Sequence, residues 1–255
     1  IWRRIRSGKR VPFRREMRKE MREFMRIVKI CFFSLAIAVL IAVIALMLSG
    51  CSAKRELEDR AIVAGIGVDF VEDSVSELAM TVQILSFQSD NFGEGGGAGT
   101  SGTWNLKLYG DEPFDMIQAA IRKLNKPLYL SHNNIIVFSK ETAESGLRNY
   151  IDFFLRDYEA RLSVPLMIAE DSAADVLSVK PKLDSVGAQA LKEMAEIQSL
   201  GGQSVNTTVF DFATNLQSAE KATMIPLVKV EGEGEEQINR ITGAAVFRED
   251  TMVGS

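Results

Sequence analysis

Histidine and cysteine are scarce in this sequence, whose 255 residues include one histidine, His132, and two cysteines, Cys31 and Cys51. Zinc sites are built mainly from these residue types, and thiol proteases and serine hydrolases use them as nucleophile or base. His132 is followed by two asparagines, and no G-x-S-x-G pattern supplies a serine partner for it. We therefore expect His132 to be a hydrogen-bonded structural residue at the start of a strand, and we expect no catalytic residue and no metal.

Charged residues are missing from positions 30–50, whereas residues 1–29 contain 12 Lys and Arg against three Glu. The 19 residues of 30–48 have Ser34 as their polar interruption, and about 20 apolar residues are enough to cross a bilayer as a helix. The cations flank only the N-terminal side of this stretch. The positive-inside bias therefore places the N-terminus in the cytoplasm and the rest of the chain outside.

The apolar stretch ends in a lipobox, Leu48, Ser49 and Gly50 followed by Cys51. A lipoprotein peptidase needs small residues before a thiol that carries diacylglycerol, so we predict diacylglycerol and an N-acyl lipid on Cys51 and no other cofactor. Several acyl chains on one residue give stable attachment to membrane lipid. An uncleaved signal anchor with an incidental cysteine is the alternative.

Residues 25–50 have the composition of a lipoprotein signal peptide, with a basic start before the apolar run. Residues 1–24 are then a basic N-terminal extension, either translated upstream sequence or a cytoplasmic segment. A basic amphipathic tail lying on anionic lipid is the alternative. Cys31 leaves with the signal, so disulfides contribute nothing to the mature chain. Because the sequence starts at Ile1 and stops in mid-pattern at Ser255, we expect a fragment at both ends.

The chain after Cys51 is acidic, with 18 Lys and Arg against 31 Asp and Glu. Phosphate repels such a domain, so we expect no nucleic acid as partner.

Hydrophobic periodicity predicts an α+β (mixed α/β) fold, in which a signal or transmembrane-like helix precedes a mixed sheet packed by helices. Strands are expected at 61–70, 77–86, 128–139, 162–169, 224–230 and 238–247, and helices at 113–124, 141–156, 172–179, 186–200 and 210–216. The predicted organisation is a lipidated tether at 51–60, a mixed domain at 61–180 with a mobile glycine-rich loop at 87–102, and a helical connection with the truncated start of a second α/β domain at 181–255.

Three further groups could carry chemistry. Gly65 and Gly67 lack the third glycine of a dinucleotide-binding turn, so we interpret them as permitting a bulge or a close approach of the backbone. Asp69, Glu72 and Asp73 are too few for a calcium loop and are interpreted as a solvated hairpin.

The segment containing Arg156, Asp157 and Arg161 closes a predicted helix, whose C-terminus favours cations. We expect an ion-paired helix end there, in which Asp157 or Glu159 pairs with Arg156 or Arg161. Contact with a partner is the alternative.

Several motifs resemble the Ger(x)C family of spore germination lipoproteins, the C subunits of GerA-type nutrient germinant receptors. They are the LSGC lipobox, RELED at 55–59, AIVAGIGVDF at 61–70, the stretch 132–138, the block 152–161 and ITGAAVF at 241–247. The sequence departs from the family in having Ser52 where tryptophan often follows the lipidated cysteine, and in the glycine-rich loop. Family members also continue beyond the point where this chain stops.

The resemblance implies a non-enzymatic subunit on the outer face of the spore inner membrane, working with A-type and B-type membrane subunits. It also implies a multi-domain mixed α/β architecture without a catalytic site. Two other functions stay open: a solute-binding lipoprotein of a membrane transporter, which needs two lobes and a cleft, and an envelope hydrolase, which needs paired carboxylates or a nucleophile in a pocket.

Overall fold

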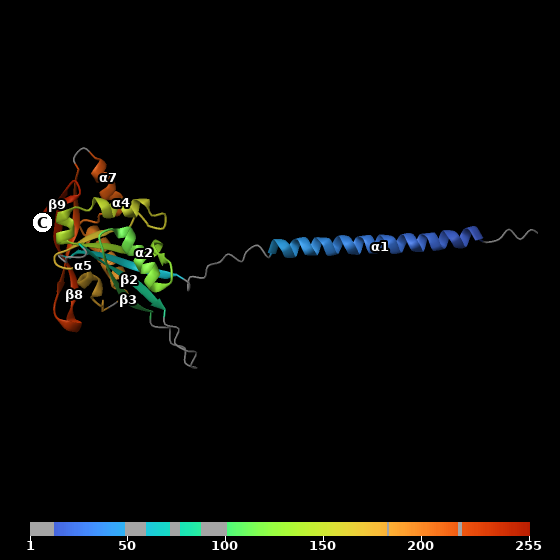
Figure 1. The fold of residues 1–255 in the computed structure, drawn as a ribbon, viewed down its shortest axis with the longest axis horizontal. Helices are drawn as coiled ribbons and strands as arrows, with labels where there is room; N and C mark the ends of the chain where they lie inside the picture. The colour runs from blue at the N-terminus through green and yellow to red at the C-terminus, as the bar shows by residue number, and fades with distance from the viewer. Residues whose placement is uncertain (1–12, 49–59, 72–76, 88–100, 183, 219–220) are drawn as a thin grey trace, which may run out of the picture. The chain divides into compact units, whose positions relative to one another are not determined.

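The computed structural model describes residues 13–48, 60–71, 77–87, 101–182, 184–218 and 221–255 (Figure 1). The chain divides into two compact units, Ile1–Arg55 and Glu56–Ser255, and each is described by itself below.

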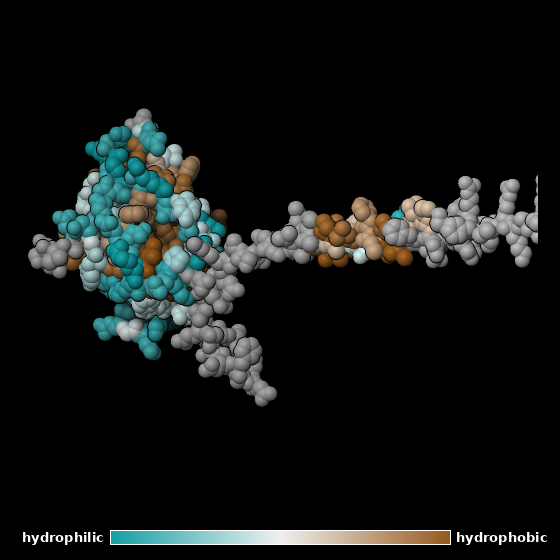
Figure 2. Space-filling view, turned by 45° about the vertical axis from the view of Figure 1, so that its right-hand side comes forward, coloured by the Kyte–Doolittle hydropathy of each residue, from teal (hydrophilic) through white to brown (hydrophobic). Residues whose placement is uncertain are grey.

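The first unit contains one helix, α1 (Phe13–Leu48), in the part that the structure describes. Hydrophobic side chains are brown along this helix in Figure 2. No helix within the described residues is both long enough and apolar enough to span a membrane. The predicted membrane-length stretch 30–48 includes side chains from position 42 onward that lie outside the described residues. Of the lipobox, Leu48 is the last residue of α1, and Ser49, Gly50 and Cys51 lie outside the described residues.

The second unit is built on a mixed sheet of nine strands in the order β3-β2-β1-β5-β6-β7-β8-β9, with β4 paired to β1. Its strands are β1 (Ala61–Phe70), β2 (Leu78–Phe87), β3 (Ser101–Gly110), β4 (Leu128–Tyr129), β5 (Ile135–Ser139), β6 (Leu166–Ala169), β7 (Ala222–Glu231), β8 (Ile238–Arg248) and β9 (Thr251–Gly254). The four central strands β1, β5, β6 and β7 are parallel, and antiparallel hairpins extend the sheet on both sides. The α+β fold class is therefore confirmed.

Residues of the central strands alternate between two hydrophobic cores, one on each face of the sheet. In β5, Ile136 and Phe138 join the larger core while Ile135 and Val137 join the smaller one. All four side chains are at most 1% exposed. A strand that is buried on both faces needs a continuous run of apolar residues, and the sequence of β5 is such a run.

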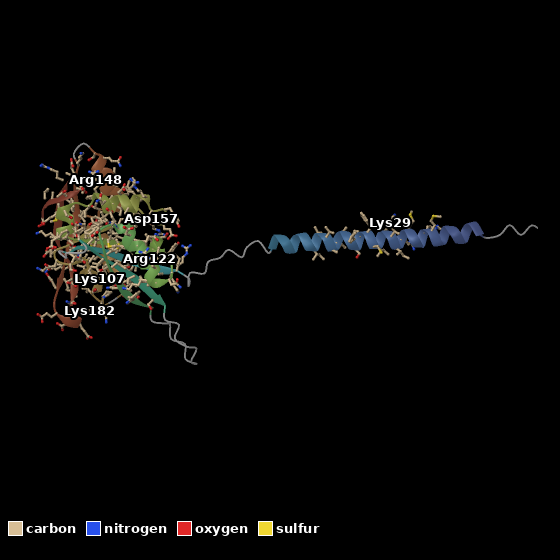
Figure 3. All side chains as sticks on the ribbon, viewed as in Figure 1. Lys29, Lys107, Arg122, Arg148, Asp157 and Lys182 are labelled. Carbon is tan, nitrogen blue, oxygen red and sulfur yellow. The ribbon has the colours of Figure 1, made fainter. Side chains whose placement is uncertain are left out.

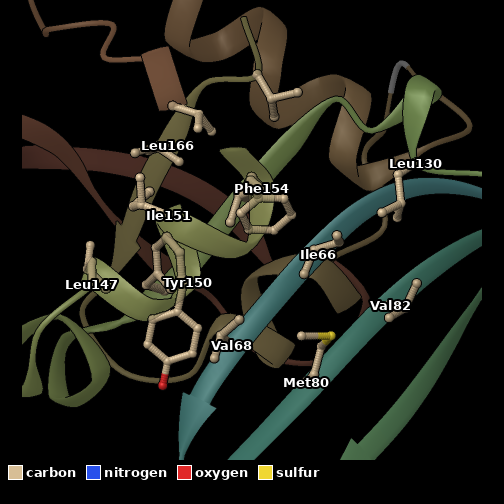
Figure 4. Close-up of a cluster of buried hydrophobic side chains, with 14 of the residues drawn as sticks. Ile66, Val68, Met80, Val82, Leu130, Leu147, Tyr150, Ile151, Phe154 and Leu166 are labelled. Atoms are coloured by element: carbon tan, nitrogen blue, oxygen red, sulfur yellow. The ribbon is translucent and has the colours of Figure 1, made fainter. Parts of the chain in front are cut away.

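Helices cover both faces. The larger core receives α2 (Pro113–Leu124), α3 (Lys140–Ser145), α4 (Arg148–Arg156) and α7 (Val209–Gln217), and the smaller core receives α5 (Ala173–Ser178) and α6 (Gly187–Leu200). Figure 4 shows Tyr150 and Phe154 of α4 packed over Ile66 and Val68 of β1. Burial, with the negative charges of Glu112 and Glu77, raises the pKa of Tyr150 to about 12, so its phenol stays neutral.

Gly65 and Gly67 permit the close packing of α5 and α6 on β1, as the sequence predicts. A Cβ atom at Gly65 would lie 2.7 Å from the Cβ of Ala188, and one at Gly67 would lie 3.0 Å from Leu177 Cδ1. The pairing of β1 with β2 also shifts register between Val63 and Gly65, which is the expected bulge.

Two strands at the edges of the sheet were not predicted. Strand β3 begins inside the predicted loop 87–102, of which residues 88–100 lie outside the described residues. Its leucines, Leu106 and Leu108, are buried on either side of the exposed Lys107, but the pattern is short and follows six nearby glycines. Strand β9 has four residues and is defined by its pairing with β8.

Two predicted elements are each divided in the structure. The predicted strand 128–139 is interrupted by a 3-10 turn at Leu130–His132, and the predicted helix 141–156 is interrupted at Gly146, which has φ 109°. The structure has no counterpart of the predicted division between 61–180 and 181–255. Strand β7 pairs with β6 in one sheet, and residues 56–255 form one unit. A proline at position 181 reveals a break in a helix but not which strands pair across it.

Replacement of Gly65 by Ala should lower the free energy of unfolding by about 1–3 kcal/mol, because the new methyl group overlaps Ala188. Gly243→Ala on β8 is the matched control, since nothing lies within 4 Å of a Cβ there. Urea denaturation followed by circular dichroism measures both. Equal effects of the two substitutions would contradict close packing as the role of Gly65.

Candidate functional site

Because β1, β5 and β6 are parallel, their N-terminal ends lie together at one end of the sheet and their C-terminal ends lie together at the other. We call the first the start edge and the second the end edge; neither term refers to the outermost strands. At the start edge, Arg60 precedes β1. Its Nη1 atom lies 3.2 Å from Glu159 Oε1, and its guanidinium carbon lies 5.0 Å from the ring centroid of Tyr129. Both charged side chains are partly buried. Arg60 therefore joins the first strand to the segment that follows α4.

The segment that follows α4 is organised by Asp157, the residue at the helix C-cap. Asp157 Oδ1 accepts hydrogen bonds from the backbone N–H groups of Glu159 at 2.8 Å and Ala160 at 3.2 Å. Arg156 pairs with Asp152 one turn earlier, at 2.7 Å. The ion-paired helix end thus takes a different form from the predicted one, because Asp157 binds backbone groups and Glu159 pairs with Arg60.

His132 and the predicted site residue Arg161 line one small hollow of about 60 Å³ at the same edge. The other lining residues are Asn133, Asn134, Ser163, Val164, Pro165 and Lys192. The His132 ring lies 5.4 Å from the Tyr129 ring, and the neighbouring Ser131 hydroxyl donates to the carbonyl oxygen of Glu159 at 2.9 Å. The structure therefore brings together Arg60, His132 and the block 156–161, which are far apart in the sequence.

At the end edge, the buried carboxylate of Asp69 receives the first N–H groups of α5. The N–H groups of Ala173 and Ala174 donate to it at 2.6 and 3.0 Å, and the Ser172 hydroxyl lies 3.4 Å away. Burial raises the pKa of Asp69, although these hydrogen bonds and the charge of Lys107 act in the opposite direction. The interpretation of Asp69 as part of a solvated hairpin is therefore wrong, because its side chain is buried against partners about a hundred positions away in the sequence.

Asp69 also lines a polar cavity of about 630 Å³ at the end edge. Phe70, Val71, Lys107, Ser139, Lys140, Glu141, Glu144, Glu170, Asp171 and Ser172 complete its lining. Across the part of the chain that the structure describes, no group of three His, Cys, Asp or Glu side chains lies close enough to hold a metal ion. The other acids of the predicted hairpin, Glu72 and Asp73, lie outside the described residues.

A second buried polar side chain, Gln83, holds α5 and α6 against β2. Its amide nitrogen donates to the carbonyl oxygen of Leu177 at 2.7 Å, and its amide oxygen accepts from the N–H of Ala188 at 3.0 Å. Like Asp69, this residue serves helix ends, which otherwise leave N–H and C=O groups unpaired. Both side chains are therefore structural, and the start edge is the better candidate for interaction.

The Asp69→Asn variant should lower the free energy of unfolding by about 1–2 kcal/mol, because an amide nitrogen cannot accept the hydrogen bond from Ala174. The raised pKa means that the folded protein binds this proton more tightly than the unfolded chain. The stabilising contribution of Asp69 therefore declines as the pH rises from about 4 towards the raised pKa.

Urea unfolding of wild type and variant should accordingly differ more at pH 4 than at pH 7. The exposed Asp171→Asn variant controls for the loss of one charge. A larger difference at pH 7 would mean that the hydrogen bonds to the ionised carboxylate outweigh the effect of burial.

Comparison with known proteins gives matches along most of the chain. The family model described as the spore germination protein N-terminal domain matches residues 53–230. Spore germination protein KC of Bacillus subtilis (strain 168) is 27% identical over 195 residues, which cover 74% of this chain and 47% of that protein. YfkR of the same organism, whose name also refers to spore germination, is 23% identical over 217 residues, or 84% of this chain and 56% of that protein.

The chain spans about half the length of these curated relatives. No solved structure matches it significantly. The family model covers more than half of the chain and runs without interruption across position 181, in agreement with the single sheet. The chain therefore belongs to the Ger(x)C family of spore germination proteins, and its folded unit carries their N-terminal domain.

Proposed function

We propose that this chain is the lipid-anchored, non-catalytic subunit of a spore nutrient germinant receptor, acting in receptor assembly and germination signalling. Membership of the Ger(x)C family is the observation that carries the proposal. The match to the family's N-terminal domain begins at residue 53, two positions after Cys51, so the domain follows directly on the lipobox. The relative KC is itself named as a spore germination protein.

The anchor in this proposal is lipid on Cys51. Its support is the order of features along the sequence, namely a basic segment, an uncharged stretch at 30–50 and the lipobox ending at Cys51. The compact second unit begins at Glu56, so few residues separate it from the modified cysteine. We infer that the signal peptide is removed and that the folded unit lies on the outer face of the spore inner membrane.

The partners in this proposal are the A-type and B-type membrane subunits of the receptor. Attachment to the same membrane raises the effective concentration of the subunits near one another, which strengthens weak contacts. The described charges near the start edge support a role in binding rather than in catalysis. Glu159, Asp157 and Asp152 are each engaged by an arginine or by backbone N–H groups, so none of them is positioned as a free acid or base.

Affinity purification from spore inner membranes tests the proposal. Cys51→Ala should abolish acylation and lower recovery of the two polytopic partner subunits by about tenfold, because the folded unit loses its lipid anchor. Cys31→Ala is the matched control and should retain both properties, since Cys31 lies within α1 and is removed with the signal peptide. The full gene is expressed with tagged neighbouring genes in a sporulating host.

Mass spectrometry of the Cys51 peptide and of the co-purified proteins provides the two measurements. If the wild-type protein is recovered alone, or with an ATP-driven transporter, the receptor proposal fails. Recovery of a transporter would favour the solute-binding lipoprotein instead.

A further inference from the structure

Helices α2 and α4 both end at the start edge. Strand β3 runs parallel to β1 and finishes at the end edge, because Gly110 is level with Leu78, and Leu78 is level with Phe70. Helix α2 then returns to the start of β1, where the N–H of Ala61 donates to the carbonyl oxygen of Pro127 at 3.0 Å. Helix α4 also returns towards this edge, because Glu159 just beyond it pairs with Arg60.

Both helix ends carry cations, and α2 packs against α4. Arg122 and Lys123 lie in the last turn of α2, Arg156 ends α4, and Arg161 follows it. All four side chains are exposed. In Figure 3, Arg122 and Asp157 lie on the right of the folded unit, where its first strand begins, and Lys182 lies at the lower left.

An exposed aromatic residue, Tyr158, lies between Arg156 and Arg161 in the sequence. Tyr158 is 93% exposed, and its hydroxyl donates to Glu159 Oε1 at 3.3 Å. Such a ring, with an apolar body and a polar tip, is favoured at the headgroup level of a membrane, and arginine and lysine are attracted to anionic headgroups. We call Arg122, Lys123, Arg156, Tyr158 and Arg161 the start-edge surface.

The start-edge surface stays cationic because the cations near it outnumber the acids. Asp152 pairs with Arg156, Glu159 pairs with Arg60, and Asp157 accepts two backbone hydrogen bonds. Five arginines and lysines, including Arg60, thus stand against three carboxylates, although the whole chain after Cys51 is strongly acidic. The excess acid lies elsewhere, including the end-edge cavity and the β7–β8 turn at 231–236. A negatively charged surface would therefore attract the start edge and repel the end edge.

The length of the connecting segment limits how far the start edge of the folded unit can lie from the lipid. Nine residue steps separate Cys51 from Arg60, a reach of at most about 30 Å even when the segment is fully extended. We propose that the start-edge surface rests on the anionic headgroups of the membrane that holds Cys51, so that the unit is oriented and not merely tethered. This inference rests on the proposed anchoring at Cys51.

Depth-dependent fluorescence quenching in vesicles tests the orientation. The whole chain, with Cys31→Ser as background, is reconstituted into vesicles of phosphatidylcholine alone or with about one third phosphatidylglycerol. A fluorophore is attached at Leu155→Cys on α4 or, as the distant position, at Glu235→Cys in the β7–β8 turn. Quenchers on lipid headgroups should quench the label at position 155 at least twofold more than the label at 235, and only in anionic vesicles.

Charge reversal identifies the residues responsible. Arg122→Glu with Lys123→Glu should remove most of the additional quenching at 155, as should half-molar salt, which screens headgroup attraction. Lys180→Glu with Lys182→Glu makes the same charge change at exposed positions away from the surface and should leave the quenching intact. Circular dichroism checks that all variants are folded.

Equal quenching at positions 155 and 235, or quenching that survives reversal of Arg122 and Lys123, would overturn the proposal and leave this surface for a protein partner. The mass of the Cys51 peptide is measured in the same preparation. A missing acyl group is therefore detected separately from a failure of the start-edge surface to contact lipid.

Discussion

Burial of β1, β5 and β6 on both faces is the constraint on which the architecture of the folded unit depends. A sheet that is apolar on both sides requires a layer of helices on each, and the chain supplies α2, α3, α4 and α7 on one side and α5 and α6 on the other. Helices α5 and α6 lie close to β1, because the residues that meet there are small. Gly65 faces Ala188, and Gly67 faces Leu177 and Ala173. A Cβ added at Gly65 would have to displace Ala188 at the start of α6.

Polar groups within this layered structure are used mainly to satisfy the helix ends that the layers bury. Asp69 binds the first N–H groups of α5, and Gln83 connects the last turn of α5 with the first turn of α6. These two side chains come from neighbouring strands, β1 and β2, and are at most 7% exposed. The position of α5 and α6 over the sheet therefore depends on directional hydrogen bonds as well as on apolar contact. The internal carboxylate of Asp69 and the internal amide of Gln83 therefore serve the fold by holding helix ends.

The sequence predicts most elements of the fold but few of the contacts between them. Apolar runs such as 61–70 and amphipathic patterns such as 113–124 reflect local burial, and both elements appear at the predicted positions. Gly146 could have signalled the division of the helix predicted at 141–156, but a glycine within such a pattern is often tolerated. The pairings of Arg60 with Glu159 and of Asp69 with α5 span about a hundred positions, and no local pattern contains them. The block 156–161 was identified as a candidate site by its charges, whereas Arg122 and Lys123 could be added only once α2 was seen to end beside it.

The position of β7, β8 and β9 in the sheet also affects how the chain can reach its folded state. Phe247 and Met252 belong to the same core as Ile66 and Met80, so the core is closed by residues nearly two hundred positions apart. Contacts of such long range make folding slow, because the intervening chain must be ordered before they form. A chain that crosses a membrane from its N-terminus would leave this core incomplete until β7, β8 and β9 had emerged. The partly emerged chain would then be a substrate for chaperones and proteases, and the rate at which residues 222–254 leave the translocation channel would control the yield of the folded unit.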